Sequence, residues 1–320
     1  MTNDFLTNDF TKRRTTPIRK RSTVKFGFSS YSFYQKMQTG EMSLFDVFDW
    51  VAQSEGQHLE LATVSLSEQM TSDSSTLDTD PEFVAAIKAK AASTGVELSN
   101  LVIPADFLPG TREEFDYQME RVKGHIRVAD ELGIRLFRHD VVTWAHRDSG
   151  IEDFERSLPV IVDASKEIAQ FAAGYGITTS IENHGLMMNA SERVRRLIYL
   201  VDEPNFKTTL DVGNFLVVDE NPVTATTQNL PVASIIHLKD FYIRPERDYP
   251  GPGWLLTAGG NHIRGSIVGY GDMDMRSIFR AIEASDFDGY VSIEFEGIED
   301  CLLGAELGFE NTLRILEEIR

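Results

Sequence analysis

The sequence predicts an α/β protein built as a single (β/α)8 barrel, and three observations support this. From residue 24 onward, short β-rich runs alternate with amphipathic stretches at helical spacing, which indicates a parallel sheet covered by helices. Eight strand-like runs fall between residues 24 and 319, a length typical of one closed barrel. The chain of 320 residues is 42% hydrophobic, which suits an extensive core.

The alternative is an open, doubly wound sheet. Such sheets usually have fewer strands and often a glycine-rich turn that binds phosphate. No G-x-G-x-x-G or G-x-x-x-x-G-K-[ST] motif opens any predicted helix in this chain. The closed barrel is therefore the prediction.

The first half of the barrel is read from β-rich runs, helical periodicity and stop signals. Phe26 and Phe28 mark the first strand, and Gly133 ends a long helix. The predicted strands are 24–29, 57–62, 96–103 and 134–139, and the predicted helices are 43–54, 81–92, 111–132 and 153–173.

The second half repeats the pattern. The predicted strands are 177–182, 206–211, 234–238 and 289–295, and the predicted helices are 190–202, 222–230 and 304–319. Residues 241–271 are expected to be irregular and rich in glycine. Because long loops in compact domains often act as lids, this segment is a candidate lid.

The first 23 residues differ from the rest of the chain. They are rich in lysine and arginine, with only Asp4 and Asp9 as acidic residues. No apolar stretch follows, so a secretory signal is not predicted. We expect a basic arm at 1–23 and a catalytic barrel domain at 24–320.

Charge and cysteine content restrict the partners and the compartment. The formal net charge of −19 opposes binding to nucleic acid and to anionic membranes. No run of about 18 apolar residues predicts a membrane span. Cys301 is the single cysteine, so no intrachain disulfide forms and a cytoplasmic location is expected. A homo-oligomer is compatible with the sequence, but no interface can be located.

Four potential metal ligands lie at the ends of four successive predicted strands. They are Glu182, Asp211, His237 and Glu294, at spacings of 29, 26 and 57 residues. In a barrel these strand ends are neighbours on the carboxyl-terminal rim, where such enzymes keep their active sites. Each residue alone is commonly structural, and the four together could form a hydrogen-bonded network.

A divalent cation explains the four residues better than such a network. Three carboxylates placed together repel one another, and a cation removes that conflict. His237 adds a neutral nitrogen ligand. Three oxygen ligands and one nitrogen suit manganese first, with cobalt, magnesium or zinc as alternatives.

The segments around these residues resemble the xylose-isomerase-like TIM-barrel family. The resemblance rests on Ser180–Gly185, Thr209–Asn214, His237–Asp240 and Gly289–Gly297, and it covers residues 24–319. That family contains sugar and sugar-phosphate isomerases and epimerases, tagatose and psicose 3-epimerases, inosose dehydratases and hydroxypyruvate isomerases.

The resemblance implies a metal-dependent isomerase or epimerase that acts on a sugar or sugar phosphate. It implies that Glu182, Asp211, His237 and Glu294 bind one metal, with Glu182 and Glu294 as the acid–base pair. The metal would lower the pKa of the C–H beside a ketone, and a proton would move through a metal-bound enediolate.

Three positions depart from the pattern of the related 3-epimerases. Those enzymes usually carry a histidine where this chain has Asn214, and a glutamate where it has Met188. They place an arginine at the position of Ile243, beside Arg244. Ketohexose 3-epimerase activity is therefore not the specific expectation.

Further residues are expected around the substrate. Strand alternation places His184 with Glu182, and Lys239 with His237. Glu60 and His139 end the second and fourth strands, and Trp144 and Arg264 lie on loops near the rim. These six are the candidate substrate contacts, although a second-shell hydrogen bond or core packing is the alternative for each.

Three other functions compete with the isomerase. A metal-dependent lyase or dehydratase on a keto-inositol or a 3-keto-glycoside would use the same metal and base. A related apurinic-site nuclease needs more ligands and a basic face, which the net charge of −19 opposes. An inactive binding module would not need all four ligands.

Overall fold

The computed structural model describes residues 24–66, 77–144, 146 and 150–320. The predicted basic arm at 1–23 lies outside these residues. Eight parallel strands close into a barrel in the order β1-β11-β7-β6-β5-β4-β3-β2, which confirms the predicted fold class. They are β1 (Lys25–Ser29), β2 (His58–Ala62), β3 (Glu97–Ile103), β4 (Leu136–His139), β5 (Thr178–Glu182), β6 (Phe206–Asp211), β7 (Ala233–Leu238) and β11 (Tyr290–Ile293).

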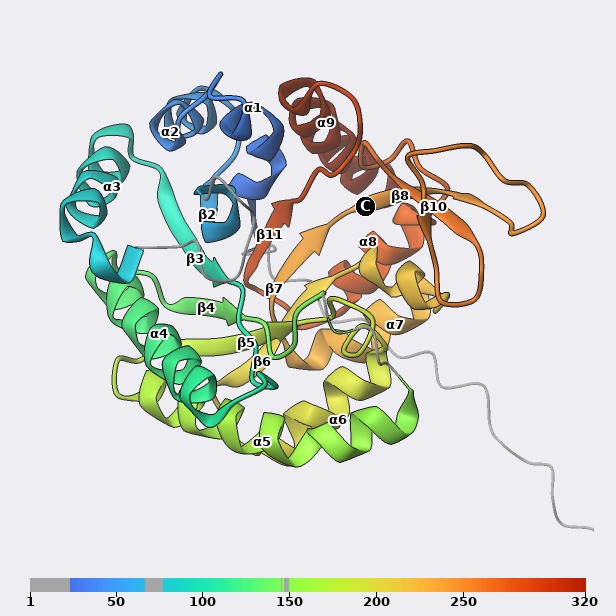
Figure 1. Cartoon of the computed structure of the whole chain (residues 1–320). Coiled ribbons are helices and arrows are strands. Elements are labelled where there is room, and N and C mark those ends of the chain that lie inside the picture. The colour runs from blue at the N-terminus through green and yellow to red at the C-terminus, as the bar shows by residue number, and fades with distance from the viewer. Residues whose placement is uncertain (1–23, 67–76, 145, 147–149) are drawn as a thin grey trace, which may run out of the picture.

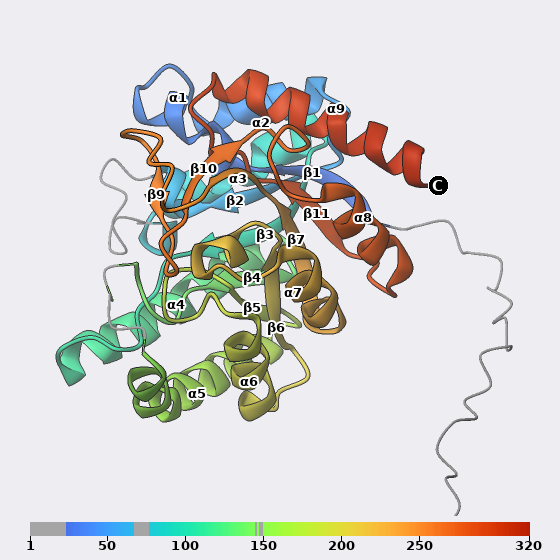
Figure 2. The same ribbon diagram turned by 90° about the vertical axis from the view of Figure 1, so that its right-hand side faces the viewer.

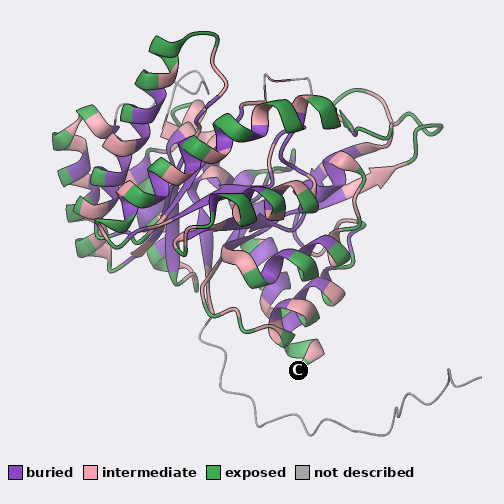
Figure 3. Ribbon diagram, turned by 90° about the horizontal axis from the view of Figure 1, so that it is seen from below, coloured by how far each residue is buried: buried purple, intermediate pink, exposed green. Residues whose placement is uncertain are grey.

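Helices surround the barrel (Figure 1). Except in the short α1, which has no buried residue, their buried faces point inward and their exposed faces point outward (Figure 3). They are α1 (Tyr34–Gln38), α2 (Leu44–Gln53), α3 (Pro81–Thr94), α4 (Arg112–Glu131), α5 (Ile151–Ala173), α6 (Ser191–Val201), α7 (Pro222–Asn229), α8 (Met275–Ala284) and α9 (Cys301–Ile319). None of the helices in the described part of the chain has the length and apolar character needed to cross a membrane.

The helix boundaries follow local capping chemistry. Ser43 and Thr111 each form a reciprocal capping box with the acidic residue three positions later, so α2 and α4 begin where predicted. Pro81 occupies the first turn of α3, and Gly95 ends it in the left-handed conformation. These caps fix the helices that carry the chain back to the next strand.

The segment expected to be irregular contains a second, antiparallel sheet. Its strands are β8 (Asp240–Arg244), β9 (Leu255–Leu256) and β10 (His262–Ser266), in the order β8-β10-β9. The expectation of an irregular 241–271 was therefore wrong. The strands of this sheet pair antiparallel and no helix lies between them. The alternation of strand and helix that predicted the barrel strands is therefore absent here.

The small sheet stands beside the barrel ring and next to its carboxyl-terminal rim (Figure 2). β8 starts two residues after β7 ends. A Cβ atom on Gly265 of β10 would lie 2.1 Å from the carbonyl oxygen of Glu296, so only glycine allows this approach. The sheet is thus seated on the loop that follows β11.

One helix was not predicted. In α8, Met275, Ile278, Phe279 and Ile282 are buried, at the spacing of one helical face. That periodicity is present in the sequence, but no element was predicted between the glycine-rich segment 241–271 and the strand at 289–295. With α8, the unit between β7 and β11 contains its helix.

Candidate metal centre

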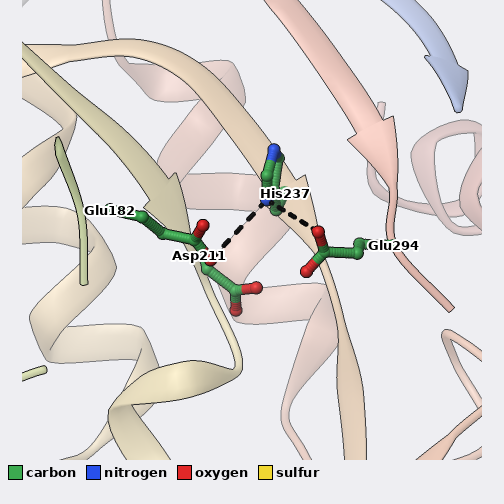
Figure 4. A group of neighbouring side chains, drawn as sticks. All are labelled: Glu182, Asp211, His237 and Glu294. Carbon is green, nitrogen blue, oxygen red and sulfur yellow. Dashed lines mark ion pairs between the residues drawn. The ribbon is translucent and has the colours of Figure 1, made fainter. Parts of the chain in front are cut away.

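The four residues predicted as metal ligands converge on one point at the carboxyl-terminal end of the barrel (Figure 4). Glu182 ends β5, Asp211 ends β6, His237 lies in β7 and Glu294 directly follows β11. One potential ligand atom from each lies within 4.8 Å of the other three, and all four residues are buried.

The strand register explains why they meet. Asp211 pairs with His237, and Glu182 pairs with Thr209, two residues before Asp211. Side chains two residues apart on a strand face the same side, so Glu182, Asp211 and His237 all face the barrel interior. Glu294 joins them because its backbone N–H donates to Leu238 O at 3.0 Å, continuing the ladder beyond β11.

Two ligand atoms have no hydrogen bond from any described residue. They are His237 Nδ1 and Asp211 Oδ2, and both are buried. A buried polar atom without a hydrogen bond is costly, and a cation between these atoms would remove that cost. Three carboxylates and one imidazole nitrogen form a donor set that divalent transition metals accept. The residues present therefore fit a divalent metal.

Two basic side chains share these carboxylates. Lys239 Nζ lies 2.8 Å from Glu294 Oε2 and 3.4 Å from Asp211 Oδ2. Arg138 Nη2 lies 3.0 Å from Glu182 Oε2 and 2.6 Å from Asp140 Oδ1. Both basic residues are buried, so the site contains fixed positive charge next to each acid.

The three acids differ in pKa because their neighbours differ. Burial opposes ionisation of Glu182, but Arg138 outweighs it and lowers the pKa to about 2. Burial is likewise outweighed at Glu294, where Lys239 and His237 hold the pKa well below its usual value. At Asp211 burial prevails over Lys239, and the pKa rises to about 7.

Backbone and amide groups orient Asp211. Gly213 and Asn214 donate their backbone N–H groups to Asp211 Oδ1 at 2.7 and 2.8 Å. The Asn183 side chain brackets the Asp211 backbone, donating to its carbonyl at 2.8 Å and accepting from its N–H at 2.9 Å. Oδ1 is therefore occupied, and Oδ2 is left to face the site.

Asn214, which replaces the histidine usual in the 3-epimerases, joins two parts of the site. Its Nδ2 donates to Glu182 Oε1 at 2.9 Å, and its Oδ1 accepts from Lys239 at 3.3 Å. A neutral amide can make both contacts because it has a donor and an acceptor. Asn214 thus orients Glu182.

The candidate contacts His184 and Trp144 lie together beside Arg138. His184 Nδ1 lies 3.4 Å from Asp140 Oδ1, and Trp144 Nε1 donates to His184 Nε2. Asp140 also accepts from Arg138, so this group is connected to Glu182. The His184 side chain is 27% exposed, which leaves it open to a ligand.

Lys239 and Glu60 also belong to the centre. Lys239 extends from the acids to Glu296, whose Oε2 lies 3.0 Å from Nζ, and Tyr31 donates to the other Glu296 oxygen at 3.2 Å. Glu60 Oε1 lies 2.9 Å from His237 Nε2, at the opposite edge of the ring from Nδ1.

His139 faces away from the centre, and Arg264 lies on the small antiparallel sheet. Arg138 pairs with Ser180, which shares the face of Glu182, so His139 points to the other face of β4. There its ring lies near Phe107, Phe137 and Phe206 and is fully buried. Arg264 lies on β10, over the rings of Tyr242 and Trp254 at 5.3 and 4.9 Å.

Sequence reasoning missed Arg138 and Asp140. Successive side chains of the fourth strand point alternately to the barrel interior and to the surrounding helices. Which of them point to the interior depends on the register with β5, which the sequence does not reveal. A buried arginine within an apolar strand was the available signal, because arginine is rarely buried without a partner.

The closed barrel and the four-residue cluster define a class of TIM-barrel protein with a candidate metal centre among the residues that the structure describes. Within this class, a model described as the xylose isomerase-like TIM barrel matches residues 48–319. The chain therefore belongs to the xylose isomerase-like TIM-barrel family, as the motifs predicted.

Curated relatives match over part of their length. Inosose dehydratase from Clostridium botulinum (strain Alaska E43 / Type E3) is 24% identical over 145 residues, which cover 44% of this chain and 48% of that protein. A second inosose dehydratase, from Lactiplantibacillus plantarum, is matched over 43% of its length. The matched segments thus span less than half of these relatives.

Solved structures share the fold across nearly the whole chain. The IolI protein with a bound zinc atom has a TM-score of 0.69 and 17% identity, covering 93% of this chain and 99% of that one. D-psicose 3-epimerase, solved in the presence of D-fructose, has a TM-score of 0.67 and 17% identity, covering 92% and 99%. At this identity the likeness establishes the fold alone.

Proposed function

We propose that this protein is a divalent-metal-dependent isomerase or epimerase that moves a proton on a small sugar or sugar phosphate. The observation that carries the proposal is the placement of Glu182 and Glu294 around His237. Glu182 Oε1 lies 3.8 Å and Glu294 Oε1 lies 3.4 Å from His237 Nδ1, and the two carboxylates approach from different strands (Figure 4).

The proton transfer assigned to this site needs a base beside a carbonyl carbon. A bound divalent cation would supply Lewis acidity toward a ketone oxygen and a neighbouring hydroxyl. Glu294 and Glu182 are both ionised at neutral pH because their pKa values are lowered, so either can accept a proton. Bases on two faces of a carbon give epimerisation, and one base serving two carbons gives isomerisation.

Polar side chains connected to the same centre would bind the substrate. Lys239, His184 and Trp144 are our proposed substrate contacts. Lys239 contacts Glu294 directly, and His184, which bonds Trp144, is connected to Glu182 through Asp140 and Arg138. Arg138 holds Glu182 in place and balances its charge. His139 is not retained as a contact, because it faces the core, and Arg264 stays a proposed contact from the small sheet.

For the metal we propose manganese first. Three oxygen ligands and one nitrogen favour a cation that accepts both, and cobalt, magnesium and zinc follow. The zinc described for the IolI protein belongs to that protein. We also propose that the protein works in the cytoplasm and does not act on nucleic acid, given one buried cysteine and the net charge of −19.

The test combines metal analysis with isotope exchange. The purified protein is analysed for bound Mn, Co, Mg and Zn, then incubated with ketoses, ketose phosphates and keto-inositols in D2O. We expect one metal per chain and deuterium incorporation beside the carbonyl without loss of a leaving group. A protein that binds no divalent metal, or exchanges no proton on any of these compounds, would refute the proposal.

A metal-dependent lyase is the second candidate, and one observation favours it. His184 is paired with Asp140, and although burial opposes protonation, Asp140 outweighs it and raises the pKa of the ring. Once Trp144 releases Nε2, the ring can take up a proton at that atom and donate it to a departing hydroxyl. The curated relatives are inosose dehydratases. Loss of water or of an aglycone in the same assay would select this candidate.

A further inference from the structure

A buried carboxylate on β2 contacts the edge of His237 that faces away from the other ligands. Glu60 Oε1 and Oε2 lie 2.9 and 3.0 Å from His237 Nε2. Asn100 on β3 donates from Nδ2 to Glu60 Oε2 at 3.2 Å. Glu60, Asn100 and His237 are all fully buried. The three side chains form a continuous chain from β3 through β2 to β7.

This chain determines which nitrogen of His237 is available. A neutral imidazole has one N–H and one lone-pair nitrogen, and only the latter binds a cation. A carboxylate oxygen accepts from an N–H, so a neutral ring that contacts Glu60 through Nε2 carries its proton on that nitrogen. Nδ1, which lies 3.4 Å from Glu294 Oε1, is then the nitrogen that faces the other ligands.

The geometry also argues against a direct substrate contact. Both Glu60 oxygens are within 3.0 Å of the same ring nitrogen, and one also accepts from Asn100. The Glu60 side chain is fully buried, whereas that of His184 is 27% exposed.

We propose that Glu60 is a positioning residue for the metal centre. It fixes the protonated nitrogen and the plane of the His237 ring, and Asn100 in turn fixes Glu60. This inference rests on the proposed metal-dependent function. It assigns Glu60 a different role from the substrate contact expected at its strand end. A carboxylate that accepts from a ligating histidine typically contributes 10- to 100-fold to metal affinity.

The experiment measures Mn²⁺ affinity, by EPR of the free ion, for wild type, Glu60→Gln, Glu60→Leu, Asn100→Ala and the double variant Glu60→Leu/Asn100→Ala. Glu97→Gln is the matched control, because Glu97 is a carboxylate at the start of β3 that bonds Lys25 and Tyr290 instead of a ligand. Thermal unfolding confirms that each variant is folded. Zn²⁺-loaded wild type with ¹⁵N-labelled histidine reports which His237 nitrogen carries the proton.

We expect affinity to fall in the order wild type, Glu60→Gln, Glu60→Leu, with a loss of about 10- to 100-fold for leucine. Glutamine is intermediate because its amide oxygen still accepts from Nε2. As a single substitution, Asn100→Ala weakens Mn²⁺ binding. Added to Glu60→Leu it has no further effect, because Asn100 acts through Glu60. The ¹⁵N spectrum shows a proton at Nε2, and Glu97→Gln binds like wild type.

Unchanged Mn²⁺ affinity in Glu60→Leu, together with a raised KM, would overturn the positioning role and indicate a substrate contact. Additive losses from Asn100→Ala and Glu60→Leu would also contradict it, as would a protonated Nδ1. If wild type itself binds no divalent metal, the proposed function fails as well, so the two failures are distinguishable. Should Glu60→Leu not fold, the glutamine and Asn100→Ala variants decide.

Discussion

At the residue scale, the site gives three chemically similar carboxylates three different environments. Glu182 faces Arg138, Glu294 faces Lys239, and Asp211 has its Oδ1 occupied by backbone N–H groups while burial dominates its ionisation. Neighbouring charges that separate acid strengths are typical of catalytic centres. The difference in pKa among the three acids indicates that they have different roles in the site.

Replacing either proposed acid–base residue should stop catalysis without unfolding the protein. Glu182→Gln and Glu294→Gln keep the size of the side chain but cannot take up a proton. We expect each to lower kcat by about 10³-fold or more, since general acid–base catalysis contributes 10² to 10⁴ and both are also proposed ligands. Steady-state kinetics and circular dichroism measure this. Retention of a tenth of wild-type kcat in either variant would exclude its role.

Asp211 should make the metal-free protein less stable as the pH rises. Its pKa is raised from 3.8 to about 7 in the fold, so its contribution to stability is present below pH 3.8 and is lost as the pH rises through about 7. Asp211→Asn removes this dependence. We expect the variant to gain a few degrees in Tm relative to wild type at pH 8, and little at pH 4.5.

The measurement is thermal unfolding in a chelator across this pH range. Glu97→Gln serves as the control, since Glu97 lies outside the metal centre. If the difference in Tm between wild type and Asp211→Asn is the same at both pH values, the raised pKa of Asp211 is contradicted.

How far the sequence predicts the site depends on whether it reveals which residues of each strand face the barrel interior. Glu182, Asp211, His237 and Glu294 could be identified because they follow short strands at repeating intervals. Arg138 could not, because the adjacent His139 was equally placed and only the pairing with Ser180 separates their faces. Glu60 was found as a strand end, but its contact with His237 joins residues 177 positions apart.

At the scale of elements, the barrel strands and most helices were predictable from local signals, whereas the β8–β10 sheet was not. Antiparallel strands of two to five residues give too little alternation to recognise, and one of them, Leu255–Leu256, has both side chains exposed. The sheet depends instead on specific polar contacts with the barrel. Asp219 provides several of them.

Asp219 should be needed to hold the turn between β9 and β10. It has a positive φ of 57° and accepts from Thr257 Oγ1 at 2.8 Å, Asn261 Nδ2 at 2.7 Å and the Gly259 N–H. Asp219→Ala loses all three bonds and strains the backbone. We expect a loss of about 3 kcal/mol in unfolding free energy, since bonds to a charged group contribute about 1.5 to 3 kcal/mol each and some are replaced by water.

Urea unfolding and limited proteolysis of residues 245–262 test this. Asp219→Asn is the matched variant, because its amide oxygen accepts and asparagine tolerates positive φ. It should keep most of the stability. If alanine and asparagine behave alike, the contacts of Asp219 are not the cause.

At the scale of the whole molecule, the four ligands come from β5, β6, β7 and the end of β11, which are consecutive in the ring. A cation bound there would join half of the barrel. The ligands are 112 residues apart from first to last, 294 minus 182, so the unfolded chain does not assemble them.

Binding a divalent metal should therefore stabilise the fold. A ligand present at 1,000 times its Kd contributes about 4 kcal/mol when it binds only the native state. We expect Mn²⁺ to raise the Tm of wild type by several degrees and that of Asp211→Asn by much less. Scanning fluorimetry with and without a chelator measures the shifts. Equal shifts in the two proteins would mean that the metal binds elsewhere.

The position of the β8–β10 sheet has an evolutionary consequence. It departs from the tip of one barrel strand and returns before α8, so every hydrogen bond of the ring is made without it. Such an appendage can be lengthened or exchanged while the barrel ring and the four clustered residues are inherited intact. A lineage built on this scaffold can therefore remodel the surroundings of the loop after β11 without disturbing the ring.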